Sequence, residues 1–325
     1  MLEQLFQSIG PHSVVLFLGA TDTGKTTLIR QLHQQLGGEV IDADVGQSWL
    51  GPPACISRGA LLNENIEIRA SYFVGDISPR GNFLPVLTGV AHCLRGAARP
   101  LLIDTDGYIT GEAARAYKSE LIRLVCPDVL VLLQRAGELA YYKLYAHQDI
   151  TVIEIPVTHT GSKSREERIR AREDAFREYF RNTQLQVWHL AELGVERALI
   201  GHGEPLDTRL LSNLLACPVR AAWRLSSTAT LVVERWPFSV TEAQRALGVE
   251  SLSVLLWGEL KDSLVGCCVG EHLAGLGTVQ DLSSETISVL TAVERATTIQ
   301  WGSLKVFADG RHERQRSPKP ASCED

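Results

Sequence analysis

The chain has 325 residues, of which 45% are hydrophobic, and it carries a formal net charge of −6. This length and composition allow a large buried core and about two domains. The negative charge excludes a general attraction to nucleic acid, so any polyanionic partner must be bound by a local basic patch.

The sequence shows no signal for export or membrane insertion. Residues 1–7 lack a basic leader, and no apolar run approaches the ~20 residues that span a membrane. We therefore expect a cytoplasmic protein without a membrane partner. Seven cysteines form no C-x-x-C pair, which favours reduced, buried side chains over disulfides or a zinc site.

The first chemical motif follows a short predicted leading helix and the apolar run 14–18. Residues 19–26 have the spacing G-x-x-x-x-G-K-T and lead into an amphipathic helix. Strand, glycine-rich loop and helix together predict a phosphate-binding loop, because backbone N–H groups and the helix dipole attract an anion there. An ordinary glycine-rich turn would leave a buried lysine unexplained. The nucleotide-binding residues are predicted to be Gly19, Thr21, Asp22, Thr23, Gly24, Lys25, Thr26 and Thr27.

Acidic residues follow two further predicted strands. Residues 39–42 form one strand, which ends at Asp42 and is followed by Asp44 and Gln47. Asp44 could orient Mg²⁺ through water or accept a proton from an attacking hydroxyl, and Gln47 could position either. A plain Asx turn is the structural alternative.

A second acid competes with Asp44 for the metal. The buried strand near residue 101 ends in Asp104, which is the Walker B pattern, and the sequence leaves the choice between Asp104 and Asp44 open.

A strand at 66–74 leads to residues 78–81, whose Ser, Pro and Gly fit a turn. Helices are predicted at 83–94, 112–125 and 139–146, and strands at 128–133 and 150–157. This alternation predicts an α/β fold with a doubly wound, mostly parallel sheet.

Residues 163–181 form a predicted helix that is crowded with arginine. Arg168 and Arg172 share one side of it, at four-residue spacing. A solvated mixed-charge helix is the alternative. Its place after the last core strand favours a lid over phosphates, where an arginine can contribute ~10³ to 10⁵ in rate.

Five motifs now stand in one order: residues 19–26, D-x-D-x-G-Q at 42–47, Y-F-V-G at 72–75 with S-P-x-G at 78–81, D-T-x-G-Y at 104–108, and the arginine helix. Over about the first 180 residues this set resembles the polynucleotide 5′-hydroxyl kinases. That family includes the eukaryotic pre-mRNA cleavage-factor kinase, the ribosomal-RNA-processing kinase and archaeal and bacterial relatives.

The resemblance implies roles for individual residues. Lys25, Asp44, Arg168 and Arg172 would be catalytic, with Asp44 activating the 5′-hydroxyl. Tyr108 stands where many members have Trp, which leaves a stacking face but puts base preference in doubt. Metal contacts would come from Thr26, Asp44, Gln47 and Asp104. Substrate contacts would come from Asp42, Gln47, Ser78, Pro79, Arg80, Gly81, Thr105 and Tyr108.

The second half of the chain has a different pattern. Strand-like runs separated by glycine or charged turns predict a smaller β-rich domain at 184–308, after a P-loop kinase domain at 1–183 with its lid at about 160–183. A helix is expected at 208–215. Residues 309–325, rich in Arg, Pro and Ser, are predicted to be a disordered tail. The expected runs are 185–193, 219–233, 253–257, 263–269, 286–290, 297–301 and 303–307.

The resulting hypothesis is an ATP-dependent polynucleotide 5′-hydroxyl kinase that uses Mg²⁺ and acts on single-stranded RNA or DNA ends. The alternatives are an ATP-binding scaffold without turnover and a P-loop kinase for a nucleoside or other small molecule. A regulatory GTPase is disfavoured because the chain lacks an N-K-x-D motif. The sequence identifies no protein partner.

Overall fold

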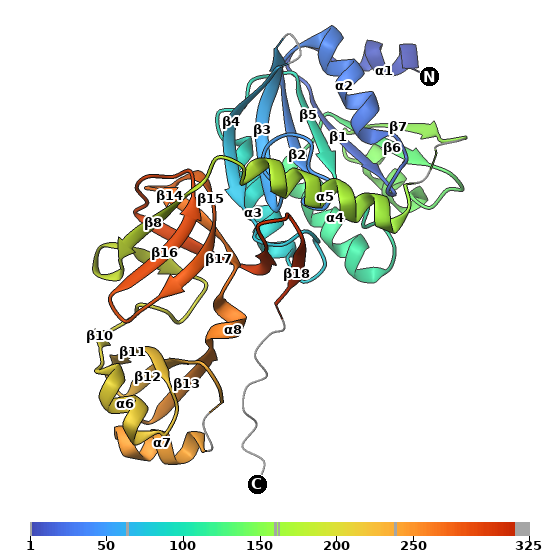
Figure 1. Ribbon diagram of the computed structural model, residues 1–325. Coiled ribbons are helices and arrows are strands. Elements are labelled where there is room, and N and C mark those ends of the chain that lie inside the picture. Colours follow the sequence, from blue (N-terminus) through green and yellow to red (C-terminus); the bar gives the residue numbers. More distant parts are fainter. Residues whose placement is uncertain (1, 63–64, 159–160, 162, 237–238, 316–325) are drawn as a thin grey trace. The chain divides into compact units, whose positions relative to one another are not determined.

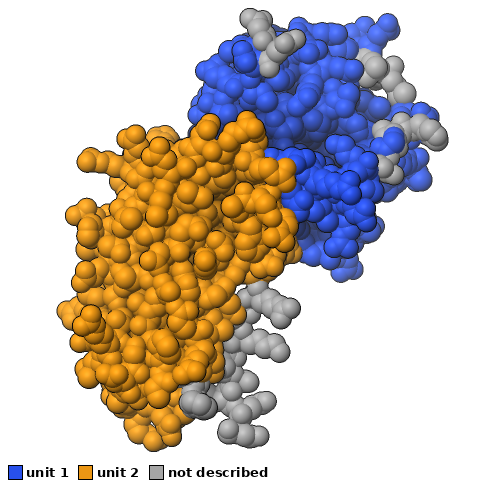
Figure 2. Space-filling model, viewed as in Figure 1, with its two compact units in different colours: residues 1–175 blue, residues 176–325 orange. Residues whose placement is uncertain are grey.

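A computed structural model describes residues 2–62, 65–158, 161, 163–236 and 239–315. The chain divides into two compact units, residues 1–175 and 176–325 (Figure 2). The division falls inside the helix α5 (Arg165–Tyr179), before the domain boundary predicted after residue 183.

Unit 1 is built on a seven-stranded sheet with the order β4-β3-β2-β5-β1-β6-β7 (Figure 1). The strands from β2 to β7 in this order run parallel, whereas β3 and β4 form an antiparallel hairpin beside β2. The predicted mostly parallel sheet is thereby confirmed. The strands are β1 (Val14–Gly19), β2 (Glu39–Ala43), β3 (Cys55–Leu62), β4 (Asn65–Phe73), β5 (Leu101–Thr105), β6 (Val129–Gln134) and β7 (Thr151–Pro156).

Helices cover both faces of this sheet. Successive residues of a strand point to opposite faces, so neighbouring residues pack against different helices. Phe17 packs in a cluster with Ile29 and other residues of α2, whereas Leu18 packs in another with Val86 of α3 and Leu121 of α4. The two-sided packing is the predicted doubly wound arrangement. The helices are α1 (Leu2–Ser8), α2 (Lys25–Leu36), α3 (Phe83–Leu94), α4 (Glu112–Val125) and the 3₁₀ helix η1 (Ala140–His147).

Strand β3 was not predicted from the sequence. Arg58 interrupts its apolar pattern, but its guanidinium lies 3.2 Å from the buried Glu39 carboxylate at the start of β2. Gly59 also breaks the pattern, and a Cβ there would lie 2.2 Å from the carbonyl oxygen of Glu67 in β4. A strand whose charge is neutralised by a residue distant in sequence cannot be recognised from local pattern alone.

Unit 2 is rich in strands, as predicted. One sheet follows the order β18-β17-β14-β15-β16-β8, with β9 pairing to β17, and a second has the order β10-β11-β12-β13. Trp223, Trp257 and Trp301 are buried in one hydrophobic cluster of unit 2. The first sheet contains β8 (Gln184–His189), β9 (Gly194–Glu196), β14 (Ser263–Val269), β15 (His272–Leu282), β16 (Thr286–Thr291), β17 (Thr298–Val306) and β18 (His312–Arg314). The second contains β10 (Glu204–Pro205), β11 (Val219–Leu225), β12 (Thr228–Val233) and β13 (Ser251–Leu256), and unit 2 also holds η2 (Leu190–Glu192), α6 (Thr208–Leu214), α7 (Val240–Leu247) and α8 (Trp257–Leu260).

The structure corrects four expectations in unit 2. The expected run 219–233 is two antiparallel strands, β11 and β12. The runs 297–301 and 303–307 are one strand, β17, which stays paired with β14 across a register shift. Strand β15 and helix α7 were not predicted. Residues 309–315 are ordered, since β18 pairs with β17 and the Asp309 carboxylate accepts the Arg311 backbone N–H; the rest of the predicted tail, 316–325, lies outside the described residues.

Two expectations about cysteines and membranes can also be compared with the structure. The six cysteines in the described ranges are free thiols, and five of them are buried. None of the helices in that same part of the chain combines the length and the apolar character needed to cross a bilayer.

Candidate functional site

The loop between β1 and α2 has the geometry expected of a phosphate-binding loop. Gly24 precedes the helix with a φ of 85°, a conformation that favours glycine. Lys25 is 6% exposed, and its Nζ donates to the carbonyl oxygens of Gly19 at 3.0 Å and Ala20 at 3.1 Å. The predicted strand, loop and helix are present, and Lys25 is buried against the phosphate-binding loop.

A second loop packs directly on this phosphate-binding loop. A Cβ added at Gly107, just after β5, would lie 2.4 Å from the Thr21 backbone nitrogen. Glycine is therefore required by close approach, which accounts physically for its place in the sequence D-T-x-G-Y. The structure thus joins two of the five sequence motifs at one edge of the sheet.

Asp42 is completely buried and shapes the loop that follows β2. Its Oδ1 accepts the Asp44 backbone N–H at 3.0 Å, and its Oδ2 accepts those of Trp49 at 2.7 Å and Leu50 at 3.1 Å. Burial raises the pKa of Asp42 well above its ordinary value, with further contributions from Asp104 and Asp44. Its observed contacts hold the backbone, and it does not line the cavity described below.

Asp44 is only half-buried and faces that cavity. Its Oδ1 accepts the backbone N–H groups of Gly46 at 3.0 Å and Gln47 at 3.1 Å. Burial, followed by repulsion from Asp106, raises the pKa of Asp44 to about 6, although the positive charge of Lys25 opposes the shift. A carboxylate with this pKa can accept a proton near neutral pH.

Asp104 lies at the end of β5 and is 1% exposed. Its Oδ2 accepts the Thr26 hydroxyl at 2.6 Å and the Trp49 indole N–H at 3.1 Å. Its Oδ1 is buried and has no hydrogen-bond partner among the described residues. Burial raises the pKa of Asp104, and Lys25 works against that shift.

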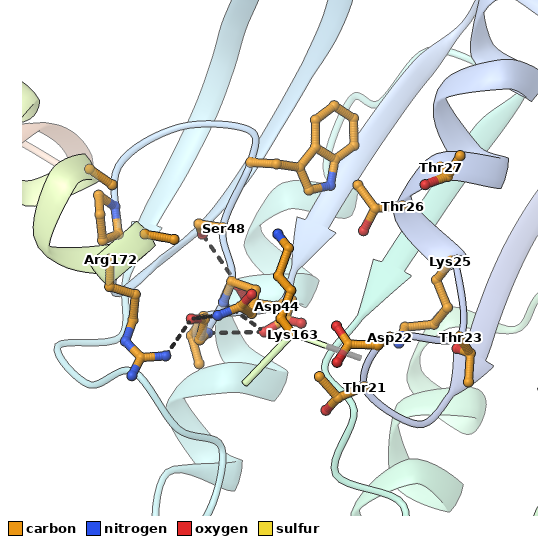
Figure 3. A pocket seen from close by; sticks show the side chains of 18 of the residues that line it. Thr21, Asp22, Thr23, Lys25, Thr26, Thr27, Asp44, Ser48, Lys163 and Arg172 are labelled. Atoms are coloured by element: carbon orange, nitrogen blue, oxygen red, sulfur yellow. Dashed lines mark hydrogen bonds between the residues drawn. The ribbon is translucent and has the colours of Figure 1, made fainter. Parts of the chain in front are cut away.

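Lys25, Thr26 and Asp44 line a cavity of about 460 Å³, whereas Asp42 and Asp104 are not part of its lining (Figure 3). In Figure 3, Asp44 lies between Arg172 on one side and Asp22 and Lys25 on the other. The cavity therefore brings together the phosphate-binding loop, the acidic loop after β2 and one arginine of the predicted lid. Its lining consists of residues 21–27, Arg30, residues 44–49, Pro53, Gly161, Lys163, Ala171, Arg172 and Ala175.

The two predicted lid arginines make different contacts. Arg172 lines the cavity and donates from Nη1 to the Gly46 carbonyl oxygen at 3.2 Å, and burial lowers its pKa. Arg168 does not line the cavity, but its Nη2 lies 3.3 Å from the Asp22 carboxylate. Both side chains thus connect α5 to loops of the candidate site.

Of the predicted substrate residues, Gln47 lines this cavity, whereas the turn at 78–81 and Tyr108 do not. In the turn at 78–81, Ser78 accepts the Arg80 backbone N–H at 3.2 Å and donates its own backbone N–H to Asp76. The Arg80 guanidinium lies 5.3 Å from the centre of the Tyr108 ring. Tyr108 also stacks on Phe83, with ring centres 6.0 Å apart.

Thr105 is also outside the cavity. Its side chain is fully buried, and its hydroxyl donates to the carbonyl oxygen of Phe17 in β1 at 2.7 Å. The contact ties β5 to β1, so the hydroxyl stabilises the sheet.

Several residues of the site were not identified from the sequence. Arg30, Ser48, Trp49, Pro53 and Lys163 line the cavity. For Arg30 a signal was available, because it lies one helical turn beyond Thr26 on the same helix face. Arg135, at the end of β6, was also missed; its Nη2 donates to the Asp22 carbonyl oxygen at 2.9 Å.

A buried ion pair between Lys118 and Asp106, next to Tyr108, was also not identified from the sequence. The Lys118 ammonium is 2.9 Å from Oδ2 of Asp106, and both side chains are almost fully buried. The same oxygen accepts the Tyr117 hydroxyl at 2.7 Å, while Oδ1 accepts the Tyr108 backbone N–H at 2.9 Å. Burial lowers the pKa of Lys118, and its attraction to Asp106 opposes this. The pair thus anchors the loop that carries Tyr108.

The sequence profile of the family described as mRNA cleavage and polyadenylation factor CLP1 P-loop matches residues 19–182. The polyribonucleotide 5′-hydroxyl-kinase of Thermococcus kodakarensis is 29% identical, with 94% of this chain and 93% of that protein aligned. The corresponding protein of Pyrococcus abyssi is 28% identical over 94% of this chain and 90% of its own length.

A solved structure of Clp1p in complex with a segment of Pcf11p has a similar fold. The TM-score is 0.57 at 14% sequence identity, and the similarity covers 94% of this chain and 77% of the solved one.

Proposed function

The chain belongs to the CLP1 P-loop family, and from this premise we propose that it is an ATP-dependent polynucleotide 5′-hydroxyl kinase. It would transfer the γ-phosphate of ATP to the 5′-hydroxyl end of RNA or DNA. One observation carries the proposal: Lys25, Asp44 and Arg172 line the same cavity, as a phosphoryl-transfer site requires. The relatives from Thermococcus kodakarensis and Pyrococcus abyssi are named polyribonucleotide kinases, which favours RNA as the acceptor.

Thr26, which lines the cavity, and Asp104, which accepts its hydroxyl, fit a magnesium ion bound together with ATP. Among the described residues, no group of three or more His, Cys, Asp and Glu side chains could hold a metal by itself. Mg²⁺ in kinases is bound by one or two carboxylates together with substrate phosphates and water, so such a group is not needed. The unpartnered Oδ1 of Asp104 and the neighbouring Thr26 hydroxyl would hold the ion. When bound, Mg²⁺ neutralises charge that develops on the phosphates.

The phosphate-binding loop would receive the triphosphate of ATP. Backbone N–H groups at the start of α2 point toward an anion there, and the helix dipole adds positive potential. Lys25 would exchange the carbonyl oxygens of Gly19 and Ala20 for phosphate oxygens. Because both acceptors are neutral, the charged phosphate is the stronger partner for the ammonium group.

Asp44 would act as the general base. It faces the cavity, and its pKa of about 6 leaves it mostly ionised at neutral pH, yet basic enough to accept the proton of the 5′-hydroxyl. The N–H groups of Gly46 and Gln47 fix one of its oxygens. Asp104 accepts hydrogen bonds from Thr26 and Trp49. These contacts support a role for Asp104 in binding the metal and leave Asp44 as the group that accepts the proton.

The arginines of α5 would complete the donor side. Arg172 points into the cavity and would place positive charge on the transferring phosphoryl group. Arg168 is paired with Asp22 of the phosphate-binding loop, so it would hold the lid at this loop. We also propose residues 1–183 as the kinase domain, with its lid at about 160–183, and 184–308 as a β-rich domain.

The acceptor would be bound by the turn at 78–81 and by Tyr108. The turn would hold the phosphate beside the reacting end, and the Tyr108 ring would stack with the terminal base. The contact between Arg80 and Tyr108 supports a shared role, since guanidinium and aromatic faces are the surfaces that single-stranded nucleic acid uses.

A transfer assay with labelled ATP tests the proposal. Four acceptors are compared, namely single-stranded RNA, single-stranded DNA, a duplex and a free nucleoside. We expect label on the single strands and none with Lys25→Ala, whereas Lys143→Ala, an exposed lysine paired with Glu154, stays active. Equal labelling of the nucleoside would support a small-molecule kinase instead. Normal ATP binding without any labelled acceptor would support a scaffold.

A further inference from the structure

Trp49 connects the acids at the ends of two neighbouring strands. Its backbone N–H donates to the Asp42 carboxylate at 2.7 Å, and its indole N–H donates to Oδ2 of Asp104 at 3.1 Å. Asp42 belongs to β2 and Asp104 to β5, and the two residues are register partners in the sheet. One residue is thus bonded through its main chain to one carboxylate and through its side chain to the next.

Helix α2 holds the same indole from another direction. The Arg30 guanidinium lies 4.5 Å from the centre of the Trp49 ring, which is a cation–π contact. Thr26, one turn earlier on α2, donates its hydroxyl to the same Asp104 oxygen that accepts the indole N–H. The ring of Trp49 therefore has a fixed place between α2 and β5.

This arrangement determines how the Asp104 carboxylate is turned. Two donors, Thr26 and Trp49, converge on Oδ2 and oppose rotation of the group. Oδ1 is left buried without a hydrogen-bond partner in the described parts of the chain. A buried carboxylate oxygen without a partner is unfavourable unless an ion or water meets it.

We propose that Trp49 is a positioning residue for the cation of the ATP complex. By holding Oδ2 of Asp104, the indole N–H keeps Oδ1 directed to the place where Mg²⁺ or its water shell binds. The inference rests on the proposed function, since it concerns the ATP site of that kinase. Trp49 would act through Asp104 and would not touch the reacting atoms.

Trp49→Phe is the decisive variant. It keeps an aromatic ring for Arg30 and the backbone N–H for Asp42, and it removes the indole donor together with one ring of the indole. ATP affinity is measured by calorimetry with Mg²⁺ and again with EDTA. We expect affinity in EDTA to stay unchanged and the gain from Mg²⁺ to fall about tenfold, as for other residues that orient a metal ligand.

A second readout is the Mg²⁺ concentration that supports half-maximal transfer, which should rise by a similar factor. Trp188→Phe is the matched control, because it also removes an indole hydrogen bond, to the Glu294 carbonyl oxygen in unit 2. This control should leave both affinities unchanged.

Two results would overturn the inference. If Trp49→Phe weakens ATP binding equally with Mg²⁺ and with EDTA, the residue has a general structural role. If it changes neither affinity, the indole N–H does not position the acid. Calorimetry needs no acceptor, so a wild-type protein that binds Mg·ATP but labels no oligonucleotide would contradict the proposed function while leaving this test intact.

Discussion

The two halves of the proposed active site are built in different ways. The donor half consists of the phosphate-binding loop with Lys25, Asp44 and Asp104, and its side chains are buried or half-buried among charges and backbone groups. The acceptor half consists of the turn at 78–81 and Tyr108. The Tyr108 ring stacks on Phe83 and lies under the Arg80 guanidinium.

This difference predicts which half of the site tolerates amino-acid substitutions. In the donor half, a shift of one atom leaves a buried charge or a buried N–H without a partner, which is unfavourable. In the acceptor half, one aromatic ring can replace another with a modest change in contact area. We therefore expect large effects on turnover in the first half and smaller effects on substrate binding in the second.

The largest difference is expected from Arg172→Ala. An arginine on the transferring phosphoryl group contributes roughly 10³ or more to the rate, so turnover should fall by about that factor. ATP affinity should change far less, because the phosphate-binding loop supplies most of the binding contacts. Single-turnover transfer and calorimetry measure the two quantities separately.

Arg170→Ala is the control for this prediction. Arg170 lies on the same helix, is exposed and does not line the cavity. Its loss should leave turnover nearly unchanged. If Arg172→Ala reduced affinity and turnover by the same factor, the arginine would serve binding only.

The next largest effect separates the two acids. Asp44→Asn should lower transfer by about 10² to 10⁴, the usual range for loss of a general base, and should spare Mg·ATP binding. Asp104→Asn should weaken the effect of Mg²⁺ on ATP binding. The reverse result would exchange the two roles.

The pH profile of the wild-type enzyme tests the same assignment. Asp44 must be ionised to accept a proton, and its pKa is raised to about 6. The transfer rate should therefore fall as the pH drops through about 6, and should be nearly constant from pH 7 to 8. A rate that is unchanged down to pH 5 would contradict a base with this pKa.

Much of the donor half could be predicted from the sequence because its motifs describe backbone geometry. The spacing from Gly19 to Lys25 determines where N–H groups and one ammonium lie, whatever surrounds them. Asp44 and Asp104 follow apolar strands, and the ends of parallel strands meet at one edge of a sheet. The doubly wound sheet followed from the same alternation of strands and helices.

What could not be predicted depends on contacts between distant residues. The proposed division of roles between Asp44 and Asp104 rests on the hydrogen bonds from Thr26 and Trp49 to Asp104. Lys118 belongs to an amphipathic helix, in which a lysine is expected to be exposed to solvent. It is buried because its charge is paired with Asp106. Strand β3 was missed for the same reason, since Arg58 depends on Glu39.

A smaller effect should appear in the stability of the donor half. The folded-state pKa of Asp44, about 6, lies above its ordinary value of 3.8, so the folded protein binds this proton more tightly than the unfolded chain. Stability from this group is therefore full below pH 3.8 and is lost as the pH rises through 6. Because one pKa unit corresponds to 1.36 kcal/mol, the charge costs at most about 3 kcal/mol at pH 8.

Asp44→Asn should remove that cost while keeping an oxygen for the N–H groups of Gly46 and Gln47. In urea unfolding, the variant should be more stable than the wild type at pH 8, and the difference should shrink toward pH 4. A gain that does not depend on pH would mean that the charge of Asp44 is not the cause.

The acceptor half is tested by Tyr108→Ala, for which the smallest effect on the reaction is expected. Stacking of one base on an aromatic ring contributes ~1 to 3 kcal/mol, so oligonucleotide affinity should fall about 5- to 150-fold. ATP affinity should not change, since Tyr108 does not line the cavity. Tyr108→Trp should bind at least as well as the wild type, because the larger ring keeps the stack on Phe83 and the contact with Arg80.

Tyr141→Ala is the matched control, because Tyr141 is 47% exposed and, like Tyr108, has an arginine over its ring. Its removal should leave oligonucleotide affinity unchanged. If Tyr108→Ala behaved like this control, the terminal base would not stack there, and the acceptor half would depend on the turn at 78–81 alone. If Tyr108→Ala lowered turnover as strongly as Arg172→Ala, the proposed difference between the two halves would be wrong, because a ring outside the cavity would then control the chemistry.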